Sequence, residues 1–168
     1  MTNTLHALVG NAAALLGRFP PSVVQLALRF ALAVPFWRSG LTKWDGFLEL
    51  SGGAVFLFTS EFRLHLFGAE IAYPAPILMA WLSGVAEIVL PILLVLGLAT
   101  RFAGLGLLVM TAIIQLTIPD GWANFHLPWA AMALAVMAYG PGRISLDHLI
   151  VCLMRGGTAA GPAYRFQP

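Results

Sequence analysis

The longest apolar run of the chain, from Ile77 to Leu98, limits the fold more than any other feature of the sequence. At about 1.5 Å per helical residue the run spans roughly 30 Å, the thickness of the hydrocarbon core of a bilayer. Glu87 lies at its centre, and Pro91 follows four residues later. A carboxylate at that depth costs on the order of 3 kcal/mol, and Pro91 leaves the Glu87 carbonyl without its helical hydrogen bond. Glu87 is therefore the leading candidate for a functional residue.

The composition predicts an integral membrane protein. Of its 168 residues 60% are hydrophobic and only 10% are charged, whereas soluble domains carry about 25% charged residues. The net charge of +2 comes from basic residues scattered singly, which argues against nucleic-acid binding. A single cysteine excludes an intramolecular disulfide and a cysteine-rich metal site.

The hydrophobic pattern predicts an all-α fold, an antiparallel four-helix transmembrane bundle with short interfacial helices. Within a domain of residues 22–150, the spans are expected at residues 22–40, 77–99, 102–118 and 125–139. The flanking parts are expected to be an interfacial segment (1–21), a surface loop with one or two short helices (41–76), an interfacial helix (145–155) and a flexible tail (156–168). Pro35 and Pro91 are expected to kink the first two spans and to open a polar pocket between them.

The distribution of basic residues predicts the orientation. With four spans, one side of the membrane receives Arg18, Arg101, Arg143, Arg155 and Arg165. The other side receives Arg38, Lys43 and Arg63 together with most of the acidic residues. The positive-inside rule makes the first side cytoplasmic, so both termini are predicted to lie in the cytoplasm.

Three segments together resemble a known family. Arg29 in the first span precedes RSGLTKW, the Glu87 helix runs on into LVLGLATRFAG, and YGPGRISLDHLI follows the last span. In this combination they resemble the DoxX family of small bacterial membrane proteins, over roughly residues 25–150. The resemblance implies a compact four-helix protein of the bacterial inner membrane, in a family named from a subunit associated with thiosulfate- or quinone-linked oxidation. The segment GWANFHLPW resembles a branch often encoded beside copper-responsive secreted peptides.

Arg29 and Glu87 form the first candidate site. Both fall within the hydrocarbon layer on consecutive antiparallel spans, so we predict a charge pair that faces the interior of the bundle. One interpretation is an ion pair that fixes helix register. The other is a catalytic proton or quinone pair, in which Arg29 donates to a quinone carbonyl and Glu87 accepts a proton. Weaker candidates for contact with such a ligand are Arg38, Lys43 and Gln115, of which the first two are also ordinary interface anchors.

His126 is the main candidate metal ligand, and His65 is expected on the same side of the membrane. An aromatic belt with one polar histidine is the competing interpretation, because Trp122 and Trp129 flank His126. No HxxxH or CxxC spacing occurs, so the sequence predicts no metal site and disfavours copper and haem. We expect no intrinsic cofactor, and quinone is the ligand that the candidate pair would suit.

Three functions follow from these observations. The first is a subunit of a quinone-linked membrane redox system, and the second is a non-catalytic scaffold or cargo-handling partner in an envelope or metal-stress system. The third, a transporter gated by Glu87 protonation, is disfavoured because Gln115 is almost the only polar side chain of the last two spans. The expected partners are the lipid bilayer and a membrane or periplasmic protein, or a second copy of the chain. The sequence leaves open whether the protein is an enzyme.

Overall fold

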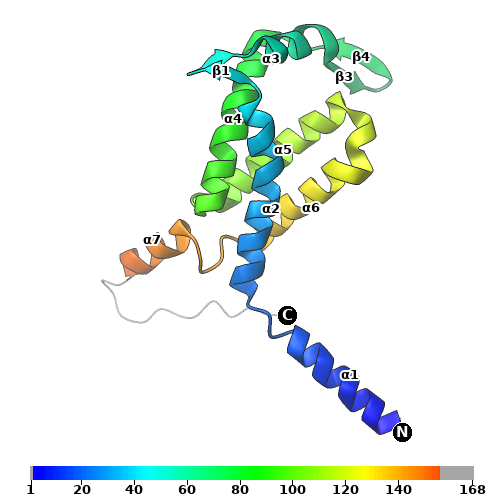
Figure 1. Ribbon diagram of the computed structural model, residues 1–168, viewed down its shortest axis with the longest axis vertical. Coiled ribbons are helices and arrows are strands. Elements are labelled where there is room, and N and C mark those ends of the chain that lie inside the picture. Colours follow the sequence, from blue (N-terminus) through cyan, green and yellow to red (C-terminus); the bar gives the residue numbers. More distant parts are fainter. Residues whose placement is uncertain (1, 156–168) are drawn as a thin grey trace.

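The computed structural model describes residues 2–155, which form a mostly helical protein with a small β-containing end (Figure 1). Four helices pack on one another around a common core: α2 (Pro21–Leu41), α4 (Pro76–Leu96), α5 (Thr100–Thr117) and α6 (Leu127–Tyr139). Helix α2 contacts α4 and α6, and α5 contacts the same two helices from the other side. The helices therefore close a ring, whose centre is filled by Leu32, Leu94, Leu107, Ala133 and Val136.

Two helices of the described region, α4 and α5, are long and apolar enough to cross a membrane. A third span is possible if α2 is joined to the end of α1 (Thr2–Leu16), from which it is bent by 59°. Helix α6 has only 13 residues, but the 3-10 turn η2 (Pro119–Gly121) and the π-helical turn η3 (Trp122–His126) lead directly into it. All four helices of the ring lie at predicted spans, with ends shifted by a few residues.

The helix ends follow from local sequence chemistry. Pro21 and Pro76 stand at the first positions of α2 and α4, where proline loses no intrahelical hydrogen bond. Gly97 ends α4 with a φ of +70°, a conformation that costs glycine little. Gly104 of α5 faces α6 so closely that a Cβ there would lie 3.2 Å from Met137. Gly104 therefore allows α5 and α6 to approach closely.

The segment between α2 and α4, predicted to be a surface loop with one or two short helices, also contains β-strands. It contains the hairpin β1 (Trp44–Gly46) with β2 (Glu49–Leu50), and the hairpin β3 (Arg63–Leu66) with β4 (Ala69–Ala72). Between the hairpins lie α3 (Gly52–Phe56) and the π-helical turn η1 (Leu57–Glu61). Polar and apolar residues alternate along β3, and the turn Phe67–Gly68 has positive φ at both residues, which is the geometry of a two-residue hairpin. The all-α expectation is therefore wrong for these segments.

We refer to residues 42–75 as the cap, because they cover one end of the helix ring (Figure 1). Contacts with α4 and α5 help to hold the cap in place. The Trp44 indole lies against α4, where a Cβ at Gly84 would be 2.6 Å from its ring. On the other side His65 Nδ1 lies 3.1 Å from the Leu116 carbonyl of α5, and Tyr73 and Thr117 share a hydrogen bond of 2.6 Å between their hydroxyls.

At the opposite end of the ring, α7 (Leu146–Arg155) runs away from the bundle. The Ser145 hydroxyl accepts a hydrogen bond from the His148 N–H at 3.2 Å, so Ser145 caps the start of this helix. None of the α7 residues is buried, and its interfacial position stays a prediction. The predicted flexible tail, residues 156–168, lies outside the described residues.

Candidate functional site

Glu87 lies inside the protein and forms an ion pair with Lys43. The Lys43 Nζ is 2.5 Å from Glu87 Oε2, and the two side chains keep only 12% and 4% of their exposure. The other carboxylate oxygen, Oε1, accepts a hydrogen bond of 3.1 Å from the Ser83 hydroxyl, one helical turn earlier on α4. Both oxygens of Glu87 are therefore satisfied, as a buried carboxylate requires.

The end of α2 brings Lys43 to this depth. Helix α2 stops at Leu41 beside the middle of α4, where a Cβ on Gly40 would lie 3.0 Å from the Glu87 backbone. The chain then makes one more turn, in which the Lys43 N–H donates to the Gly40 carbonyl at 3.1 Å. The lysine side chain thus enters between the two helices from the cap side.

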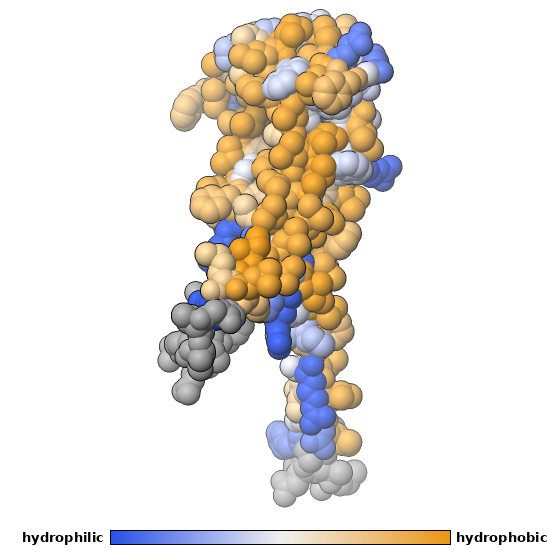
Figure 2. All heavy atoms as spheres, turned by 90° about the vertical axis from the view of Figure 1, so that its left-hand side faces the viewer, coloured by the Kyte–Doolittle hydropathy of each residue, from blue (hydrophilic) through white to orange (hydrophobic). Residues whose placement is uncertain are grey.

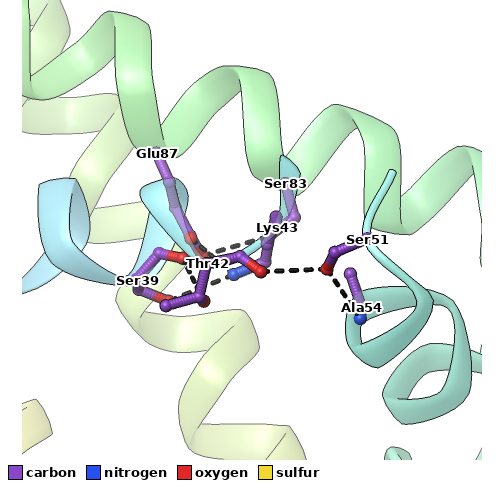
Figure 3. A network of polar contacts seen from close by, with 7 residues as sticks. All are labelled: Ser39, Thr42, Lys43, Ser51, Ala54, Ser83 and Glu87. Atoms are coloured by element: carbon purple, nitrogen blue, oxygen red, sulfur yellow. Dashed lines mark hydrogen bonds and ion pairs between the residues drawn. The ribbon is translucent and has the colours of Figure 1, made fainter. Parts of the chain in front are cut away.

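A polar network extends from this pair into the cap (Figure 3). Lys43 Nζ also donates to the Ser39 hydroxyl at 3.1 Å. The Ser51 hydroxyl donates to the Thr42 carbonyl at 2.9 Å and accepts from the Ala54 N–H at 3.2 Å, so it caps α3. The Ser51 N–H donates to the Lys43 carbonyl at 2.8 Å. The network therefore links α2, the cap and α4 through the Lys43–Glu87 pair.

The predicted ion pair between Arg29 and Glu87 is wrong. Arg29 is fully buried, but its guanidinium donates to two main-chain carbonyls, that of Leu94 at 3.3 Å and that of Ile144. The reason is axial distance, because Arg29 precedes the Glu87 contact at Gly40 by about 16 Å of helix. Arg29 binds the end of α4 nearest α7. Lys43 is the ion-pair partner of Glu87, a role that the sequence analysis assigned to Arg29.

Arg29 belongs to a clamp that joins α2, the turn between α4 and α5, and the segment leading into α7. We call it the Arg29 clamp and define it by Arg29, Gly97, Ser145 and Asp147. Asp147 accepts hydrogen bonds from the N–H groups of Ala99 (2.8 Å) and Thr100 (2.9 Å) at the start of α5. Its own N–H donates to the Gly97 carbonyl at 2.8 Å. The segments GLATR and GPGRISLDH, which carried the family resemblance, thus meet in one structural contact.

Replacing Asp147 by alanine is expected to lower the free energy of unfolding by about 1 kcal/mol, because two N–H groups at the start of α5 lose their acceptor. Unfolding in mixed micelles of sodium dodecyl sulfate and dodecyl maltoside measures this difference. Asp147→Asn keeps one acceptor oxygen and should fall between the two proteins. An Asp147→Ala variant as stable as the parent would contradict the capping role.

The candidate metal ligands are engaged in protein contacts. His126 is buried, and its Nδ1 lies 2.6 Å from Gln115 Oε1, so two residues singled out separately in the sequence form one pair. His65 contacts the carbonyl of Leu116, the residue that follows Gln115 on α5, so His65 and His126 lie at the same end of the bundle. The His65 Nε2 atom is 3.8 Å from a Glu70 carboxylate oxygen. Within residues 2–155 no group of three or more His, Cys, Asp or Glu side chains is arranged to hold a metal ion.

Of the weaker candidates, only Lys43 joins Glu87. Arg38 is exposed on the last turn of α2. The sequence carried one overlooked signal for the true site, since Ser83 stands four residues before Glu87 and on the same face of the helix. Lys43 was among the weaker candidates, but the sequence carried no signal for its pairing with Glu87, which lies 44 residues away.

A ring of apolar helices with a charge pair enclosed between two of them is the structure of a helical membrane protein. The chain belongs to the DoxX family, whose model matches residues 24–120, and this confirms the resemblance seen in the sequence. It is also similar to an uncharacterized protein of Haemophilus influenzae, with 30% identity over 139 residues that cover 76% of this chain and 83% of that protein. No solved structure matches the chain.

Proposed function

We propose that the protein is a four-span DoxX protein of the bacterial inner membrane that serves as a subunit of a quinone-linked redox system. In this proposal α2, α4, α5 and α6 are the spans, and both termini lie in the cytoplasm. The quinone headgroup binds beside the Lys43–Glu87 pair, where Lys43 replaces Arg29 in the role first assigned from the sequence. In this proposal the electrons come from a redox protein partner.

One observation carries the proposal: the Lys43 ammonium has a free donor. An ammonium has three N–H groups, and within the described residues Lys43 uses two of them, on Glu87 and Ser39. The Lys43 side chain keeps 12% of its exposure, so the protein does not enclose it completely. A quinone carbonyl is an acceptor of the kind that this N–H requires, and the neighbouring rings of Trp44 and Trp81, 6.3 Å apart and perpendicular, offer flat apolar surface for the ring.

The pair also suits proton transfer. Reduction of a quinone to a quinol consumes two electrons and two protons. Glu87 is the buried acid nearest the free donor of Lys43, and Ser83 holds its second oxygen in place. As the carboxylate of the pair, Glu87 would first accept a proton through the cap and then pass it to the reduced ligand, and it would do so twice for each quinol formed.

Quinone content measured by mass spectrometry tests this function. The parent protein and the variants Lys43→Gln and Glu87→Gln are to be purified from native membranes in nanodiscs and their lipids extracted. Loss of one charge-assisted hydrogen bond predicts about tenfold less quinone in Lys43→Gln. Arg38→Gln is the matched control, because it removes an exposed cation outside the pair and should keep the quinone.

Equal quinone content in all four proteins, or a parent protein without quinone, would contradict the redox proposal. The second result would favour the scaffold function instead. A structural observation supports that alternative, since the same polar network joins the cap to the helices and would also serve to hold a rigid docking surface. Circular dichroism and elution volume must be unchanged in the variants, so that loss of quinone is not loss of fold.

A further inference from the structure

The two hairpin turns of the cap each present an aromatic ring to the surroundings. Phe47 lies in the turn between β1 and β2, Phe67 lies in the turn between β3 and β4, and both side chains are essentially fully exposed. Leu48, beside Phe47, is also half exposed. Isolated exposed apolar residues are common, but here each of the two hairpin turns carries a phenylalanine that is essentially fully exposed.

The position of the hairpins gives these rings a shared environment. The hairpins project sideways from opposite sides of the bundle, at the height where α5 ends and η2 begins (Figure 1). Contacts already described fix the second hairpin at this height, because His65 and Tyr73 bind the last turn of α5. The first hairpin is held against α4 by Trp44, which contacts Gly84. In a membrane-spanning bundle, the ends of the spans mark the boundary between acyl chains and headgroups.

The surface below the hairpins is largely apolar. Figure 2 shows a mostly hydrophobic face that runs from the cap along the helices, with hydrophilic atoms toward the two ends and in a projection at the right-hand edge. The exposed side chains of the two most apolar helices include Leu82, Val89, Ile92, Leu105, Val109 and Ile113. Side chains of this kind are exposed in a stable protein where they face lipid. The hairpin turns lie at the upper edge of this lipid-facing surface.

We propose that the hairpin turns are membrane anchors, with Phe47 and Phe67 inserted into the interface of the leaflet that adjoins the cap. Acidic side chains next to the turns, Asp45, Glu49 and Glu70, are exposed and stay in water, which limits insertion to headgroup depth. Anchors on two sides hold the cap at a fixed height over the bundle. The inference depends on the membrane location of the chain and is independent of quinone binding.

Fluorescent labelling of the full-length protein tests the anchors. In a Cys152→Ser background, cysteines introduced by Phe47→Cys, Phe67→Cys and Ser60→Cys are labelled with nitrobenzoxadiazole. Ser60 is the control, because it is exposed in η1 between the hairpins and outside both turns. The labelled proteins are reconstituted in vesicles of phosphatidylethanolamine and phosphatidylglycerol and are exposed to iodide or to lipids with a nitroxide near the headgroup.

The proposal expects blue-shifted emission at positions 47 and 67, strong quenching by the nitroxide lipids and several-fold weaker quenching by iodide than at position 60. Iodide quenching equal to that of position 60 at both turns would overturn it, because the rings would then lie in water. Protection from both quenchers would also overturn it, since the turns would then be buried in a protein contact. Size-exclusion chromatography in detergent micelles, followed by the emission of the label, verifies that each labelled protein elutes as one folded species.

Discussion

Replacement of Glu87 by alanine is expected to lower the free energy of unfolding by about 3 kcal/mol, the largest effect of any single change in the network. The substitution leaves the Lys43 ammonium between α2 and α4 without its counter-ion, and breaking a buried pair costs about 3–5 kcal/mol. The lower end applies, because Lys43 retains 12% exposure and can turn toward the cap. Unfolding in mixed detergent micelles measures the difference.

A double variant separates charge from packing. Lys43→Met with Glu87→Leu replaces both ions by apolar side chains of similar size, and such replacements of buried pairs are often neutral or stabilising. We expect it to recover most of the stability lost in Glu87→Ala. A loss below about 1 kcal/mol in Glu87→Ala would contradict the prediction, because that is the range of solvent-exposed pairs.

The Lys43–Glu87 pair also shows how far sequence reasoning reaches in a site of this kind. The cost of a carboxylate in an apolar helix identified Glu87 without any structure, because that cost depends only on the residue and its depth. The choice of partner depended on where α2 ends relative to α4. Arg29 was the cation nearest the middle of the first predicted span, whereas Arg38 stood close to its end. The structure shows α2 ending beside Glu87, so the cation just beyond that end, Lys43, reaches the carboxylate.

The long helices and their ends were predictable because their signals are local. Apolar length places α4 and α5, Pro21 and Pro76 mark two helix starts, and Gly97 marks a helix end. The cap was not predictable in the same way. A two-stranded hairpin is marginal by itself, and here each is stabilised by contacts with helices far along the chain. The alternation in RLHL was visible in the sequence, but it is too short to decide between a strand and an amphipathic turn.

The second large effect is expected at Gly97, where substitution by alanine should lower the free energy of unfolding by about 3 kcal/mol. The φ of +70° adds roughly 1–2 kcal/mol of backbone strain for a residue with a Cβ. The new methyl group would also collide with the Arg29 guanidinium and lie 2.5 Å from the Ser145 Cβ, and overpacking typically costs about 1–3 kcal/mol. Thermal unfolding in dodecyl maltoside and mixed-micelle denaturation both measure the loss.

Backbone strain alone does not explain an effect of this size, because Ala99 in the same turn has a φ of +48° with its own Cβ. The larger part must come from displacement of Arg29 and Ser145, and this makes a distinct expectation. In an Arg29→Ala background, Gly97→Ala should cost markedly less than in the parent, because residues that share a contact are not additive. Gly52→Ala is the matched control, since a Cβ there meets nothing within 4 Å, and it should change stability by less than about 0.5 kcal/mol. Additive effects of Arg29→Ala and Gly97→Ala would mean that the Arg29 clamp does not depend on the absence of a side chain at position 97.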